Sequence, residues 1–65
     1  MNKVKGYRTM LGKTQEEMAV IIGVSINTYR TMEANPETFK IEYATKFLNE
    51  VNKLDPSVKM DDIFN

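Results

Sequence analysis

The sequence contains no cysteine, no histidine and no tryptophan. Without cysteine, neither a disulfide framework nor a thiolate metal site can support the fold. Without histidine, the chain also lacks the usual general base and the commonest metal ligand. A phosphate-binding glycine loop is absent as well, and the adjacent acids Asp61 and Asp62 are typical of a helix start. We therefore expect neither an enzyme nor a cofactor or metal site.

Long apolar runs are missing too, and the chain has only 65 residues. Its longest apolar run is far shorter than the about 20 residues that cross a bilayer, and we expect no signal peptide. A domain of this size buries only about 60% of its extended surface, so we expect a free energy of unfolding of about 3–5 kcal/mol. The sequence predicts one soluble, cytoplasmic domain over residues 1–65, stabilised by its apolar core alone.

Neither sign of charge is in excess, because nine lysines and arginines balance nine acids. Neutrality counts against nucleic-acid binding, since phosphate neutralisation normally leaves a basic footprint. The distribution of the charges makes this argument weaker, because residues 1–13 contain basic residues and no acid. Several acids also lie near expected helix starts, where the macrodipole favours a negative charge: Glu16, Glu17, Glu37 and Glu42.

Capping residues and glycines mark two short helical patterns at the start of the chain. Asn2 is a good N-cap for the first helix, and Gly12 is placed to end it in the left-handed conformation. Thr14 opens the second with a capping box whose partner is Glu17, and Gly23 ends it. Apolar stripes at helical spacing support both helices: Val4, Tyr7 and Leu11 in the first, and Met18, Ile21 and Ile22 in the second.

Two more helices and a final turn follow. Ser25 is the expected cap of a helix that runs to about Ala34, and Val24 and Tyr29 occupy the two positions of a hydrophobic staple. After Asn35-Pro36, residues 44–54 form the best amphipathic pattern, with an apolar stripe of Ala44, Phe47, Leu48, Val51 and Leu54. Asp55-Pro56 ends that helix, and Met60, Ile63 and Phe64 indicate one last helical turn on the core. The sequence predicts an all-α fold, a compact bundle of four to five helices.

The segment from Thr14 to Glu33 has the residue types that a helix-turn-helix needs. Ala19 is small enough to let the second helix come close, and Gly23 tolerates the positive φ of the turn. Apolar residues with the right spacing fill the angle between the two helices: Met18, Ile22, Val24, Tyr29 and Met32.

The stretch TQEEMAVIIGVSINTYRTME, Thr14 to Glu33, resembles the helix-turn-helix of the phage repressor and Cro family, also called XRE-type regulators. Arg8 and the closing MDDIF at Met60–Phe64 are similar to family features, whereas Asn35–Tyr43 matches poorly. The resemblance implies a lambda-repressor-like bundle of about five helices. It also implies a sequence-specific transcriptional regulator, encoded by a phage or related mobile element, that binds double-stranded operator DNA, commonly as a homodimer.

The resemblance further implies that the helix after Ser25 lies in the major groove. The helical period independently gives its outward face, and these side chains are the expected base contacts: Ile26, Asn27, Arg30 and Thr31. The expected phosphate contacts are Gln15, where relatives use a glutamine amide, and Ser25, Thr28, Asn35 and Lys40. Each of these residues also has a plainer interpretation as a surface, capping or core-covering side chain.

Glu33 is expected to have a cationic partner, because an acid in the last turn of a helix opposes the macrodipole. The resemblance suggests Arg8 as that partner in a partly buried structural ion pair, and the alternative is two unpaired surface charges.

Two interpretations of the whole chain stay open. The first is the DNA-binding regulator, with no evident small-molecule ligand, in which any dimer forms through the last two helices or only on DNA. The second is a protein-binding module that kept the bundle, such as an antitoxin or anti-repressor component. Zero net charge and the apolar Ile26 on the outward face favour the second.

Overall fold

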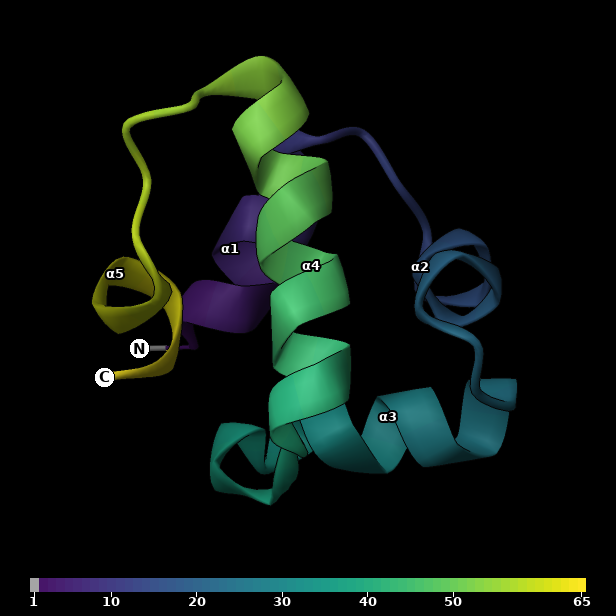
Figure 1. The fold of residues 1–65 in the computed structure, drawn as a ribbon. Coiled ribbons are helices and arrows are strands. Elements are labelled where there is room, and N and C mark those ends of the chain that lie inside the picture. Colours follow the sequence, from purple (N-terminus) through teal and green to yellow (C-terminus); the bar gives the residue numbers. More distant parts are fainter. Residues whose placement is uncertain (1) are drawn as a thin grey trace.

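The computed structural model describes residues 2–65, and its helices account for most of them (Figure 1). The elements are α1 (Lys3–Met10), α2 (Gln15–Ile22), α3 (Ile26–Ala34), a single 3-10 turn η1 (Pro36–Thr38), α4 (Ile41–Leu54) and α5 (Met60–Phe64). No β-strand occurs among these residues, so the prediction of an all-α bundle is confirmed. None of these helices combines the length and the apolar character needed to cross a membrane.

Side-chain caps begin the first three helices, as the sequence predicts. Asn2 Oδ1 accepts a hydrogen bond from the Lys5 amide at 3.0 Å. Thr14 Oγ1 accepts one from the Glu17 amide at 3.1 Å, and Glu17 Oε1 accepts one from the Thr14 amide at 2.8 Å, which completes the capping box. Ser25 caps α3 in the same way as Asn2 caps α1. These bonds satisfy amides that have no partner within their own helix.

Glycines in the left-handed region end α1 and α2. Gly12 has φ +70° and Gly23 has φ +84°, conformations that favour glycine because a side chain would be strained there. At the first stop, Lys13 N donates to Arg8 O at 3.2 Å, and at the second, Val24 N donates to Ala19 O at 2.9 Å. The chain therefore turns sharply after each helix without leaving those carbonyls unpaired.

The core lies where α4 passes between α2 on one side and α5 on the other (Figure 1). Its largest fully buried side chains are Tyr29, Phe47, Met18, Ile22, Ile63, Val4 and Val51. Phe39, Phe47 and Phe64 form an aromatic cluster, with ring centroids 4.8 to 6.0 Å apart and tilted or edge-to-face geometry. This cluster fixes α5 and the segment after η1 against α4.

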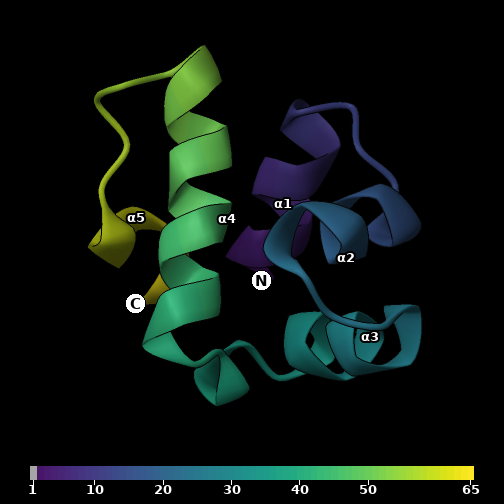
Figure 2. The ribbon, with the colours of Figure 1, turned by 45° about the vertical axis from the view of Figure 1, so that its right-hand side comes forward.

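Leu54 departs from the predicted stripe, because it is 60% exposed whereas Phe47 and Val51 are buried. The carboxyl end of α4 extends beyond the neighbouring helices, so the last position of the stripe has no core beneath it (Figure 2). Val58 packs on the core instead, and Asn52 Nδ2 holds the return loop by donating to Asp55 O at 3.1 Å and to Val58 O at 2.9 Å.

Candidate nucleic-acid interface

α2 and α3 form a helix-turn-helix unit, joined by the three residues 23–25 (Figure 2). Ala19 is buried on α2, which packs against α3, and a small side chain at this position suits a close helix–helix contact. Gly23 makes the turn in the left-handed conformation, and Ser25 starts α3 immediately afterwards. The end of α2 at Gly23 and the cap of α3 at Ser25 thus fix the direction of α3 relative to α2.

The two edges of α3 differ sharply. Tyr29, Met32 and Glu33 are buried against the rest of the bundle. The opposite edge is exposed at Asn27, Thr28, Arg30 and Thr31, and Ile26 is half-buried at the start of the helix. The structure therefore brings the four predicted base-contact residues onto one outward surface.

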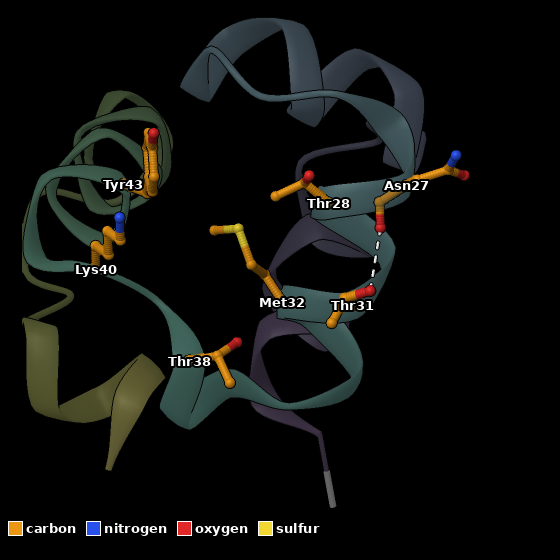
Figure 3. Close-up of a pocket in the computed structure, with 7 residues that line it drawn as sticks. All are labelled: Asn27, Thr28, Thr31, Met32, Thr38, Lys40 and Tyr43. Atoms are coloured by element: carbon orange, nitrogen blue, oxygen red, sulfur yellow. Dashed lines mark hydrogen bonds between the residues drawn. The ribbon is translucent and has the colours of Figure 1, made fainter.

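Two side chains on that outward edge are unengaged. No hydrogen bond or ion pair within residues 2–65 involves the side-chain amide of Asn27 or the guanidinium of Arg30. Asn27 points away from the bundle (Figure 3). Thr31 is different, because its hydroxyl donates to Asn27 O at 3.2 Å. The amide and the guanidinium are accordingly available to an external partner.

An open trough of about 500 Å³ runs beside this edge of α3 (Figure 3). One wall is α3, Met32 reaches into the trough, and the segment from η1 to the first turn of α4 forms the other wall. The lining residues are Asn27, Thr28, Thr31, Met32, Thr38, Lys40 and Tyr43. Sequence reasoning missed Thr38 and Tyr43. A signal for Tyr43 was present, because it lies one helical turn after the predicted contact Lys40.

The predicted phosphate contacts are divided between the two ends of α3 and the far wall of the trough. Ser25 and Thr28 lie at the amino end, where Ser25 Oγ donates to Thr28 Oγ1 at 2.9 Å. Asn35 lies at the carboxyl end, and its amide donates to Thr31 O at 3.2 Å. Lys40 is exposed at the start of α4, across the trough from α3. Thr28 and Lys40 thus line the same trough.

Gln15 is drawn into a buried network around Glu33 instead of pointing freely outward. Its amide Nε2 donates to Glu33 Oε1 at 3.1 Å. Arg8 Nε donates to Glu33 Oε2 at 2.8 Å and Arg8 Nη2 donates to Oε1 at 3.1 Å, so the guanidinium binds the carboxylate with two bonds. A third Arg8 bond, 2.9 Å long, reaches Lys13 O. A phosphate contact at Gln15 would therefore use the second N–H of its side-chain amide.

The Glu33 carboxylate is 4% exposed and the Arg8 guanidinium side chain is 13% exposed. Burial by itself raises the pKa of Glu33, but the hydrogen bonds from Arg8 and Gln15, the nearby Tyr29 hydroxyl and the Arg8 charge together lower it below its usual value. The hydrogen bonds from Arg8 to Glu33 and the negative charge of Glu33 also raise the pKa of Arg8. Both groups are therefore charged at neutral pH, and the network joins α1, α2 and α3.

Tyr29 and Asn2 complete the surroundings of Glu33. The Tyr29 hydroxyl is buried beside the pair without a partner in hydrogen-bonding geometry. Burial, and then the negative charge of Glu33, raise the pKa of Tyr29, so the phenol stays protonated. Asn2 Nδ2 donates to Glu33 O at 2.6 Å, which attaches the start of α1 to the last turn of α3. Hydrogen bonds from three residues, Asn2, Arg8 and Gln15, thus fix the position of Glu33.

Comparison of the chain with family models, with curated proteins and with solved structures gives no match. Within residues 2–65, no group of three or more acids is placed to hold a metal ion.

Proposed function

We propose that the protein is a sequence-specific DNA-binding transcriptional regulator of the repressor and Cro type, with α3 as the helix that enters the major groove. The observation that carries the proposal is the outward edge of α3, where Asn27 and Arg30 are unengaged and no other part of the described chain covers them. The major groove, about 12 Å wide, admits one α-helix. A helix held firmly along one edge and free along the other has the shape that such binding requires.

The chemistry of this edge suits base recognition. The Asn27 amide can donate to and accept from adenine in a bidentate pair, and Arg30 can donate to guanine or to a phosphate. The Thr31 hydroxyl is occupied by Asn27 O, so its methyl group is the part available to a thymine methyl, and Ile26 offers a similar apolar contact. Each good base contact contributes about 1–3 kcal/mol of discrimination.

The trough gives the sugar-phosphate strand a place beside the groove-binding helix. With α3 in the major groove, the adjacent strand passes between α3 and the wall that carries Thr38, Lys40 and Tyr43. Hydroxyl groups and an ammonium group are typical phosphate donors. Only Lys40 on this wall is charged, so most of the grip on the strand comes from neutral donors.

The small number of cations among the proposed contacts predicts a DNA affinity that depends only weakly on salt. Among the residues assigned to the proposed contacts, Arg30 and Lys40 are the cations, so we expect each copy to neutralise about two phosphates and log K to fall with log salt with a slope of about −2 per copy. A strongly basic domain has a much steeper slope. Selectivity then depends mainly on base contacts, which salt affects little.

The test is selection of bound duplexes from a random pool, followed by affinity measurements over a salt series. Asn27→Ala should lose about 1–3 kcal/mol on the selected site and relax the preference at one base position. Asn49→Ala is the matched control, because Asn49 is an exposed asparagine on α4 outside the trough, and its affinity should be unchanged. Failure to enrich any duplex, or equal losses in the two variants, contradicts the proposal.

The neutral net charge favours a second candidate, a protein-binding module that uses the same edge of α3. Amide shift mapping separates the two candidates. Shifts at Asn27 and Arg30 caused by a partner protein, with none caused by duplex DNA, would replace the DNA-binding proposal with this one.

A further inference from the structure

Lys46 of α4 has its ammonium group beside the turn of the helix-turn-helix unit. The Nζ atom lies 3.8 Å from the position that a Cβ on Gly23 would occupy. Gly23 ends α2 and is exposed, and Lys46 is exposed as well. Because Gly23 has no side chain, this residue does not cover the ammonium group. The turn between α2 and α3 therefore has an exposed cation next to it, which α4 supplies.

The charge of Lys46 is not neutralised by an acid among residues 2–65, since neither of their ion pairs involves it. Glu42 and Glu50 lie one helical turn before and after Lys46 on α4. Glu50 pairs with Lys53 at 3.0 Å instead, and Glu42 forms no ion pair among these residues. Gly23 is the C-cap of α2, and a helix carboxyl end attracts a cation through partial charges only. The ammonium group is accordingly available to an external anion.

The α4 side of the trough leads toward Lys46. Lys40 and Tyr43 line the trough, and Lys46 follows Tyr43 at the same spacing of three residues, which places neighbouring side chains together on a helix surface. In Figure 3, the segment that joins α2 to α3 crosses the end of the trough opposite Thr38. Since Lys46 lies beside that segment, its ammonium group is located at this end, just beyond the lining residues.

We propose that Lys46 binds a further phosphate of the DNA strand, at the end of the trough opposite Thr38. This inference rests on the proposed function, because its ligand is the strand that passes through the trough. Lys40 and Lys46 are six residues apart, which is about 9 Å along the axis of α4. Successive phosphates of one strand are about 3.4 Å apart along the duplex axis, so the two lysines are separated by more than one phosphate interval. They therefore bind different phosphates.

A contact of this kind changes affinity without changing base preference. An ammonium group binds a phosphate as a point charge and carries no sequence information. Each phosphate that is neutralised adds about −0.9 to the slope of log K against log salt. With Lys46 as a third cation, the expected slope is about −3 per copy, in place of about −2 from Arg30 and Lys40 alone.

The experiment measures binding of the duplex enriched from the random pool over a salt series. Lys46→Gln should make the slope shallower by about one, weaken binding about tenfold at about 0.1 M salt and leave the base preference unchanged. Lys46→Arg keeps the charge and should keep the slope. Glutamine and arginine both favour helices, so the two variants should keep the fold.

The matched control is Lys59→Gln, which makes the same change in net charge. Lys59 is exposed and directly precedes α5, which lies on the other side of α4 from α2 (Figure 1). This variant should bind the duplex with the slope of the wild type.

Two results overturn the Lys46 contact while DNA binding by α3 stands: an unchanged slope in Lys46→Gln, or equal changes of slope in Lys46→Gln and Lys59→Gln. A purely structural role at the end of α2 gives the first of these results, together with a lower melting temperature. Failure of the wild type to enrich any duplex is a different outcome, because it refutes the proposed function and the Lys46 contact with it.

Discussion

Replacing Arg8 by alanine removes the cation that neutralises a buried carboxylate. The change deletes both bonds to Glu33 and the bond to Lys13 O, and it leaves only Gln15 as a side-chain donor to the carboxylate. The Glu33 side chain is 4% exposed and the Arg8 side chain 13%, so water reaches the carboxylate of the variant only through the space that the arginine vacates. We expect a loss of about 3 kcal/mol or more, as for other buried pairs broken on one side.

That loss approaches the whole stability of about 3–5 kcal/mol expected for a domain of this size. The measurement is urea denaturation followed by far-UV circular dichroism, with an osmolyte such as TMAO present so that both proteins start folded. The control is the double variant Arg8→Met with Glu33→Leu, which replaces the pair by apolar groups and should recover most of the loss. A loss below about 0.5 kcal/mol in the single variant refutes the reasoning, because it is the value of an exposed pair.

The pH dependence gives this prediction a second readout. In the wild type the pKa of Glu33 is lowered, so its contribution is present above its ordinary value of 4.5 and is lost as pH falls through the folded pKa. In Arg8→Ala the burial remains while the main lowering contacts are gone, so the pKa rises. A raised pKa reverses the effect of Glu33 on the pH dependence of stability, because the variant then loses stability as the pH increases through that pKa. The difference in the free energy of unfolding between the wild type and Arg8→Ala should therefore narrow below pH 4.5.

Three further predictions concern local stability. Thr14→Ala removes the capping box of α2 and should lower the free energy of unfolding by about 1 kcal/mol in urea denaturation, whereas Thr14→Ser should lose only part of that. Gly6→Ala should raise it by about 1 kcal/mol, since the position is helical and open, and an unchanged or lower melting temperature would contradict this. Leu54→Ser should stay within about 0.5 kcal/mol of the wild type, and a loss as large as that of a core leucine would show that Leu54 is buried in solution.

Local signals made the boundaries of the first three helices predictable from the sequence. Asn2, Thr14 and Ser25 cap helices, and Gly12 and Gly23 stop them, because each acts through bonds or backbone angles within a few residues. Such short-range effects can be recognised without knowing the rest of the fold.

Features that depend on distant parts of the chain were not predictable in the same way. The period of α4 places Leu54 on the apolar stripe, but only the tertiary arrangement shows that no core lies beneath it. The helical position of Gln15 likewise does not show that a buried carboxylate from α3 takes up its amide. The trough beside α3 is formed by segments that meet only in the folded chain, so Thr38 could not be grouped with Thr28 before the fold was known. For Tyr43, the only signal in the sequence was its helical spacing from Lys40.

The network around Glu33 has a consequence for how α3 meets any partner. Side chains from α1 and α2 fix its last turn, and the backbone of Glu33 is bound to Asn2. The tilt of the helix is thus already determined in the free protein, and association requires little further loss of conformational entropy. The same rigidity restricts the range of ligands, because a surface that needs a different tilt must first disrupt a buried charge. In the proposed interface, a helix fixed in this way would favour ligands whose shape accepts its tilt.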